Sequence, residues 1–556
     1  MISKWLLAMV MMASLALATG EAAAADRPAM PMPPETPELL DKGKLIYFKR
    51  CSFCHGLLGD GEGPASPYMD PRPRDFTLGT FKFRTTQSGE LPTNEDLFRT
   101  VSRGLSGTGM QAFDSDVIKN GLSEDERWAV IAYVKTFAPE FNDPSLDPVK
   151  TGKVVALPKD KVSLDAESIA KGKEIFEKTK CWECHGKLGR GDGQKAFDRK
   201  DDWGFPIRIR NVTLPWKIKA GNEVEDIFMR FSTGINGTPM PSFAKTLNET
   251  DRWYLANFIK SLQHKEADSQ VLLVRKVEGD VPDAPDDSRW AAAEATDVRL
   301  TGQVVAAPRW QNPGIEMATV RAVYNDKEIA FLIEWSDPFK DVIHASDKEI
   351  DVKDIRAPGA FNSYVRANGM VPRQLATFRD AVALQFPVKP PESAKKPHFV
   401  RGDSSSAVHL WVWKSDVDAA GGHAVEEANS RGWSQPPKVQ AEEQQQVVSR
   451  AVWDQGRWSM VMKRPLNTGD KNDVQFEPGR FIPMAVNAWD GSNGEHGMIM
   501  SLSTWRYVLL EAPASASVYI YALFAVMLTA AGLYLLVRWV EARSAVSSTI
   551  SNKEGV

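Results

Sequence analysis

Four cysteines stand in two short motifs that could carry redox chemistry. Segments 51–55 and 181–185 both read Cys-x-x-Cys-His. This pattern is the attachment signature of haem c, in which the two thiols add to the porphyrin vinyl groups and the adjacent histidine meets the iron from one side. The motifs therefore predict two covalent haems c. The predicted attachment residues are Cys51, Cys54, Cys181 and Cys184.

Each iron needs a second axial ligand on its opposite face. Met110 follows His55 at the same sequence distance at which Met240 follows His185. Ligation by Met and His raises the reduction potential, and the soft thioether suits ferrous iron. We therefore predict two axial pairs, His55 with Met110 and His185 with Met240. Packing in a hydrophobic core is the alternative role for either methionine.

Other chemistries share the cysteine pattern. Four cysteines in an exported chain could form disulfides, and a Cys-x-x-Cys pair could be a thioredoxin-like redox site or bind zinc. The histidine after each pair, and a methionine at the same distance from each, favour haem. We find no dinucleotide-binding loop, no nucleophile elbow and no further cysteine for an iron–sulfur cluster in the sequence. The sequence thus predicts electron transfer and no catalytic residue of its own.

One module occurs twice. Gly107–Met110 and Gly237–Met240 are separated by the same offset as the two cysteine motifs. Helical periodicity is seen before each cysteine pair and again at the end of each module, around Trp128 in one and Trp253 in the other. Proline-containing linkers separate the modules from each other and from the remainder of the chain. The expected boundaries are 39–140 and 167–264.

The two modules resemble class I cytochromes c. Besides the motifs, the resemblance rests on Gly43, Tyr47, Trp128 and Tyr133, which stand where that family packs its first and last helices together. It implies an all-α fold that surrounds one haem and leaves one haem edge exposed.

Both ends of the chain carry apolar segments. At 1–25, a charged start, an apolar core and a run of small residues predict a secretory signal peptide that is cleaved near Ala25. Val518–Val537 carries no charge. This run is long enough for a bilayer core, which takes about 20 apolar residues. We expect a transmembrane anchor at 518–538, and Arg538 places the tail in the cytoplasm. The expected location is the bacterial cytoplasmic membrane, with one C-terminal pass and the bulk of the chain in the periplasm.

Residues 270–512 have a different residue pattern. Short apolar runs separated by Pro, Gly and Asp predict an all-β sandwich. The expected strands are 318–324, 328–335, 381–386, 408–413, 457–462, 482–489 and 501–510. The chain is thus predicted to be multidomain, with two all-α cytochrome domains, one all-β sandwich and one C-terminal transmembrane helix. Its net charge of −4 over 556 residues argues against a nucleic-acid partner.

Several of these runs resemble one family. Ile329–Asp337, Asp380–Pro387, Val408–Lys414 and Ala488–Gly491 are similar to the haem b-binding domain of the γ subunit of ethylbenzene dehydrogenase-like molybdoenzymes. The resemblance implies a β-sandwich that holds one non-covalent haem b and works with iron–sulfur and molybdopterin subunits. Four tryptophans are expected to lie in the sandwich core. They are Trp335, Trp411, Trp413 and Trp489.

That family binds haem b through a methionine and usually a lysine, and this chain departs from the pattern at both places. Phe399–Gly402 stands where the family has the methionine, and Met500 stands where it has the lysine. The candidate ligands are Met500 and, on the opposite side, His409 or His398. The alternative is a domain that kept the sandwich and lost or changed its ligands.

Together these features predict a membrane-anchored periplasmic multihaem c-type cytochrome. It would relay electrons as the electron-transfer subunit of a molybdenum/iron–sulfur oxidoreductase complex. One alternative is a dihaem cytochrome c that donates electrons to a terminal oxidase, and another is a haem-bearing sensor that binds a carbohydrate or other ligand. A dihaem peroxidase would need one displaceable axial ligand, and the equal His–Met spacing of the two modules argues against it.

Overall fold

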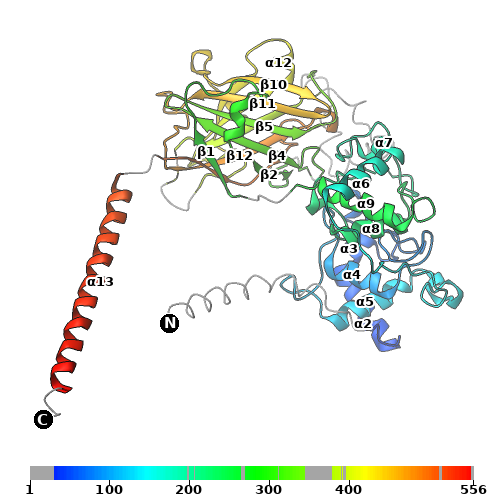
Figure 1. The fold of residues 1–556 in the computed structure, drawn as a ribbon. Coiled ribbons are helices and arrows are strands. Elements are labelled where there is room, and N and C mark those ends of the chain that lie inside the picture. Colours follow the sequence, from blue (N-terminus) through cyan, green and yellow to red (C-terminus); the bar gives the residue numbers. More distant parts are fainter. Residues whose placement is uncertain are drawn as a thin grey trace.

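The computed structural model describes residues 31–344 and 378–551, apart from short gaps at 70, 197–198, 206, 265–268, 308, 311, 390, 392–395 and 513–515. The predicted signal peptide at 1–25 lies outside the described residues. Two helical modules, a β domain and a C-terminal helix follow one another along the chain (Figure 1). This order is the multidomain architecture that the sequence predicts.

Each module is built from four helices in the same order. The side chains of Thr36 and Ser123 cap the first and last helices of module 1, and those of Asp165 and Asn248 cap the equivalent helices of module 2. The helices of module 1 are α2 (Pro37–Arg50), α3 (Ser52–His55), α4 (Asn94–Arg103) and α5 (Glu124–Lys135). Those of module 2 are α6 (Ala166–Lys178), α7 (Trp182–His185), α8 (Val224–Thr233) and α9 (Glu249–Ser261).

The first and last helices of each module cross at a glycine. A Cβ added to Gly43 of α2 would run into the backbone of Ala129 and the side chain of Tyr133 on α5. In module 2, a Cβ on Gly172 would meet Tyr254 and Phe258 of α9 in the same way. Only glycine permits this close approach, so the crossing brings the first and last helices of each module into direct contact.

The β domain is a single 14-stranded sheet within the described residues. It folds over into two layers, which are joined where β1 pairs in parallel with β14. The strands are β1 (Val271–Lys276), β2 (Thr296–Arg299), β3 (Thr301–Gly302), β4 (Met317–Tyr324), β5 (Glu328–Ser336), β6 (Ala381–Pro387), β7 (Val408–Lys414), β8 (Val425–Ser430), β9 (Lys438–Val439), β10 (Val448–Asp454), β11 (Arg457–Pro465), β12 (Phe481–Trp489), β13 (Ser501–Leu502) and β14 (Arg506–Leu510). The expected single strand at 501–510 is therefore two strands, interrupted at 503–505.

The core of the β domain lies between its two layers. Trp335 of β5 meets Trp413 of β7 with ring centroids 5.9 Å apart, and Phe331 meets Phe386 at 6.0 Å. Trp411 and Trp413 are wholly buried in this core. Trp489 instead packs in a second cluster on the outer face of its layer. Three of the four predicted tryptophans thus form the sandwich core, whereas the fourth does not.

The modules and the β domain contact one another through polar residues. Between the modules, Arg99 pairs with Asp226 and Arg84 donates to the carbonyl of Thr233 at 2.8 Å. Between module 2 and the β domain, Lys217 pairs with Glu316 at 2.8 Å, and the guanidinium of Arg299 lies 4.1 Å from the ring of Trp216. Module 2 is therefore the link between module 1 and the β domain.

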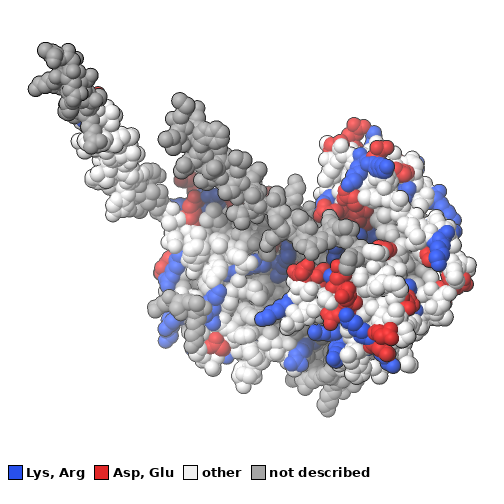
Figure 2. Space-filling view, turned by 90° about the horizontal axis from the view of Figure 1, so that it is seen from below, with Lys and Arg blue, Asp and Glu red and all other residues white. Residues whose placement is uncertain are grey.

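The C-terminal helix α13 (Ala516–Ser551) stands away from the folded domains (Figure 1). Ile520–Glu541, 22 residues with a mean hydropathy of 2.2, is long and apolar enough to cross a membrane, and none of it is buried. Its described surface shows little charge, whereas both signs mix over the domains (Figure 2). The helix is thus a candidate membrane anchor, which is what the sequence predicts at 518–538.

Candidate haem-binding sites

The cysteine motif of each module lies on a short helix that follows a longer one. Cys51 comes directly after α2, and the N–H of His55 donates to the carbonyl of Cys51 at 2.9 Å, so one helical turn separates them. Module 2 repeats this bond from His185 to Cys181 at 2.9 Å. Gly56 ends the first turn with φ of 77°. Each motif therefore presents its two thiols and its histidine from one turn of backbone.

All four thiols are unpaired. Burial, and then the neighbouring Cys54, raise the pKa of Cys51 to about 12. Burial also raises the pKa of Cys181. Burial therefore favours the neutral form of these two thiols. Unpaired cysteines are what thioether attachment to haem requires.

The two histidines are oriented by backbone carbonyls. Nδ1 of His55 lies 3.0 Å from the carbonyl oxygen of Arg74, and Nδ1 of His185 lies 3.2 Å from that of Arg210. Burial lowers the pKa of both imidazoles. A neutral imidazole that donates from Nδ1 leaves Nε2 as a base, which is the arrangement that metal-ligating histidines use.

Both methionines pack against the same buried cluster as the first cysteine of their own module. Met110 and Cys51 pack against the same buried cluster, which includes Tyr47. Met240 and Cys181 do the same in module 2. In each module, a cysteine and a methionine that are distant in the sequence thus pack against one cluster, while the axial pairs themselves stay a prediction.

The two methionine loops have the same local geometry. The N–H of Met110 donates to Oγ1 of Thr108 at 3.1 Å, and the N–H of Met240 donates to Oγ1 of Thr238 at 3.3 Å. The methionine carbonyl also accepts a backbone hydrogen bond in both loops, from Leu105 in module 1 and from Ile235 in module 2. The repeat thus extends from sequence spacing to backbone conformation.

Each module also contains a buried indole whose N–H has no acceptor among the described residues. Trp128 and Trp253 are 1% exposed, and Nε1 of each lacks a hydrogen-bond partner. Their rings pack on Phe98 and Phe228 with centroids 4.2 Å apart in both modules. A buried donor without a partner is costly. Trp128 and Trp253 are in this state at equivalent positions of the two modules, which suits a site that a bound group completes. The residues present therefore fit haem c in both modules.

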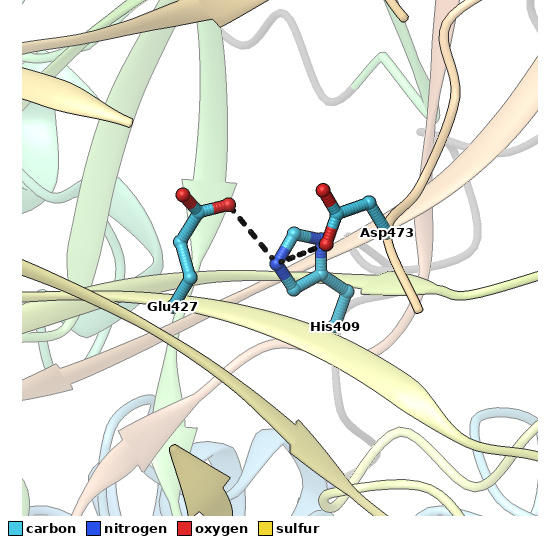
Figure 3. Close-up of side chains that lie close together, drawn as sticks. All are labelled: His409, Glu427 and Asp473. Carbon is cyan, nitrogen blue, oxygen red and sulfur yellow. Dashed lines mark ion pairs between the residues drawn. The ribbon is translucent and has the colours of Figure 1, made fainter. Parts of the chain in front are cut away.

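In the β domain, His409 is held by charged neighbours. It is wholly buried, and its Nε2 lies 3.2 Å from a Glu427 oxygen and 3.4 Å from an Asp473 oxygen (Figure 3). Nη1 of Arg464, whose side chain is also wholly buried, lies 3.4 Å from Asp473. These four side chains form a closed ion cluster, hereafter the His409 cluster.

Met500 lies elsewhere. It is wholly buried in a cluster with Val400 and Trp489, against which Val412 of β7 also packs. Because side chains alternate along a strand, Val412 and His409 project to opposite faces of β7. The two candidate ligands therefore do not face a common iron.

His398 is engaged by its own neighbours. Its Nδ1 accepts the backbone N–H of Val400 at 3.1 Å, and its ring stacks on Phe399 at 4.7 Å. Phe399 in turn packs against the cluster of Met500. The pairing of Met500 with a nitrogen ligand therefore stays a prediction.

Removing the cation of the His409 cluster should strongly destabilise the β domain. Arg464→Met keeps a long apolar side chain but leaves Glu427 and Asp473 buried without it. Breaking a buried charge pair on one side costs about 3–5 kcal/mol. We expect the free energy of unfolding, measured by urea denaturation, to fall by about that amount. Arg450→Met, at an exposed position on β10, is the control. Equal losses in the two variants would contradict a structural role for the cluster.

The fold and the sites define a class of protein: a c-type cytochrome with two modules, joined to a β-sandwich. The cytochrome c family matches residues 40–138 and 169–263. The ethylbenzene dehydrogenase family matches residues 287–436 and 428–501. The chain therefore contains two cytochrome c domains followed by a domain that matches the ethylbenzene dehydrogenase family, a family of haem b-binding domains.

Two similar proteins are a haem subunit and a γ subunit of other enzymes. A candidate respiratory nitrate reductase heme subunit of Haloferax mediterranei is 24% identical over 41% of this chain and 68% of its own length. The dimethylsulfide dehydrogenase γ subunit of Rhodovulum sulfidophilum is 22% identical over 42% and 77%. A chain from a reducing HAO-like protein complex of Kuenenia stuttgartiensis is 42% identical over 42% of this chain and all of its own, with a TM-score of 0.39. The chain is an electron-transfer haem protein with two covalent haems c.

Proposed function

We propose that this chain relays electrons as the membrane-anchored subunit of a molybdenum/iron–sulfur oxidoreductase complex. The observation that supports the proposal is the repeated arrangement in both modules, in which a backbone carbonyl orients the histidine, and the first cysteine and the loop methionine pack against one buried cluster. Two such sites, in modules that contact each other, would let an electron pass from one haem to the next. The functional units would be residues 39–140, 167–264 and 270–512.

Each residue of a site has a separate task. Cys51 and Cys54 would fix one haem and Cys181 and Cys184 the other, while His55 with Met110 and His185 with Met240 would hold the irons. A haem held in this way supplies a one-electron couple between ferric and ferrous iron. The carbonyls of Arg74 and Arg210 keep each histidine in the donating tautomer at Nδ1. Met110 and Met240 are half-buried and pack against the apolar clusters of their modules.

The β domain supports the choice of partner. The similar dimethylsulfide dehydrogenase protein is a γ subunit, and the nitrate reductase protein is a heme subunit. We infer that this chain likewise works beside a catalytic molybdopterin subunit and an iron–sulfur subunit. Met500 is the residue that we propose as a haem b ligand in this domain. The contacts of His409 with Glu427 and Asp473 favour Met500 over His409 for this role.

The location of the domains follows from the chemistry of the chain. Attachment of haem c suits an exported polypeptide, and the apolar helix at 520–541 supplies the anchor. Arg538 and the residues after it would lie in the cytoplasm. We therefore propose that both modules and the β domain lie in the periplasm, where they meet their redox partners.

Purification of the complex from native membranes tests this function. In mild detergent, molybdenum and non-haem iron should co-elute with the covalent haems of this chain. Addition of the catalytic partner's substrate, from a panel that includes nitrate, nitrite and dimethyl sulfide, should change the redox state of the c-type haems within turnover time. Co-elution without molybdenum, or haems that respond to no substrate while the complex turns over with an artificial acceptor, would contradict it.

A further inference from the structure

Three buried carboxylates meet at one end of the β domain, away from the proposed haem sites. Asp337 follows the last residue of β5, Asp380 precedes the first residue of β6, and Asp490 follows the last residue of β12. One oxygen from each lies within 4.8 Å of one from each of the others. Their exposed fractions are 0%, 0% and 7%. The cluster thus joins strand ends from both layers of the sandwich.

The protein satisfies this cluster only in part. Asp380 accepts from the N–H groups of Asp341 at 2.8 Å and Gly491 at 3.0 Å, and from the indole of Trp458 at 3.1 Å. Asp337 accepts from one backbone N–H through Oδ1, and its Oδ2 has no hydrogen-bond partner among the described residues. A wholly buried carboxylate oxygen is therefore left without a donor inside a group of carboxylates.

Charge compensation is also weak. Burial, and then repulsion from Asp380 and Asp490, raise the pKa of Asp337 well above its usual range. Burial and the neighbouring Asp341 raise the pKa of Asp490 to about 6, and Arg208 of module 2 is the cation that opposes this shift. The His409 cluster is different, because the guanidinium of Arg464 lies within it and faces its two carboxylates. Among the residues that the structure describes, no side chain places such a cation between the three aspartates.

We propose that Asp337, Asp380 and Asp490 bind a calcium ion that ties the two layers of the β domain together. The donors are all oxygen, which suits a hard cation and not zinc, copper or iron. Calcium accepts several carboxylates at once, whereas magnesium keeps most of its waters and is bound through one or two carboxylates. A divalent cation at this point would neutralise the mutual repulsion of the three side chains.

The site adjoins the interface with module 2. Asp490 accepts the N–H of Asn493 at 3.1 Å, and the side chain of Asn493 accepts a hydrogen bond from Arg208 of module 2. Asp490, Asn493 and Arg208 also line a cavity of about 190 Å³ between the two domains. The cavity offers a path by which an ion could reach the cluster. Calcium would thus stiffen the surface on which module 2 rests.

The full-length protein, with its haems in place, tests the site. After treatment with a chelator and removal of that chelator, the protein should take up one calcium ion per chain, measured by elemental analysis. CaCl₂ should raise its melting temperature by several degrees, and MgCl₂ at equal concentration should raise it less. Failure of the proposed relay function would not affect this result, because neither readout depends on electron transfer.

Asp337→Asn separates calcium binding from simple destabilisation. The variant keeps the side-chain shape and removes one repelling charge, so without calcium it should melt no lower than the chelated wild type, and calcium should no longer raise its melting temperature. Asp326→Asn, an exposed carboxylate on the turn before β5 that pairs with Lys276, should keep the full calcium response. If the wild type binds no calcium, and its melting temperature changes with pH near neutrality but not with calcium, protonated carboxyls hold the cluster and the proposal is overturned.

Discussion

Met110→His and Met240→His each lower the reduction potential of one haem and leave the other unchanged. A thioether favours ferrous iron, whereas a second imidazole donates more strongly and favours the ferric state. The expected fall is on the order of 100 mV or more, well inside the roughly 0.8 V range that axial ligands cover. Potentiometric titration of the full-length protein, followed through its visible spectrum, measures both haems at once.

Two neighbouring methionines are matched controls for this experiment. The side chain of Met69 contacts Gly109, which precedes Met110 in its loop. Met229 is buried in α8 of module 2. Met69→Leu and Met229→Leu should leave both potentials in place. A shift with Met69→Leu and none with Met110→His would show that Met110 packs in the core and that the axial assignment in module 1 is wrong.

Cys181→Ser together with Cys184→Ser should remove one of the two covalent haems and unfold module 2. Cys181 and Met240 pack against the apolar cluster of Phe176, Phe228 and Trp253. Loss of the haem should therefore expose apolar side chains of that cluster to water. Because module 2 links module 1 to the β domain, transfer of electrons along the chain should fall to background. Haem content after acid-acetone washing and single-turnover reduction kinetics measure the two effects.

Thr179→Ala is the control for the double cysteine variant. The Thr179 hydroxyl lies 3.2 Å from Sγ of Cys181 but takes no part in attachment. This variant should keep both haems and most of the transfer rate. Retention of two covalent haems by the cysteine variant would contradict the attachment sites in module 2.

The cytochrome modules can be predicted closely from the sequence because their chemistry is local. Two thiols and a histidine must lie on one helical turn, so the motif itself determines α3 and α7. The long-range pairing with methionine is a prediction that the sequence allows because the same spacing occurs twice. The contact between Arg99 and Asp226 carries no such signal, since it depends on how two folded modules meet.

In the β domain, the sequence indicates strands but not the face of each residue. β6 is buried along its whole length, because Val382, Leu384 and Phe386 face the core while Ala381 and Ala383 are covered by the cluster of Met500. Alternation of polar and apolar residues is therefore absent, and the register cannot be read from it.

His409 illustrates the limit of prediction from sequence. Its type suggests a ligand, but β7 directs it to the face of Trp411 and Trp413, beside carboxylates from distant segments. The aspartate cluster can be traced in part in the sequence, because an Asp adjoins the end of a predicted strand in three places. Only the topology shows that those ends meet.

The central claim is that two haems are covalently attached to this single chain. Acid-acetone extraction of the denatured, purified protein, followed by a pyridine haemochrome spectrum and intact mass measurement, tests it most directly. We predict that two c-type haems remain per polypeptide and that the mass exceeds that of the chain by two haem groups. A colourless polypeptide with the mass of the protein alone would contradict the account.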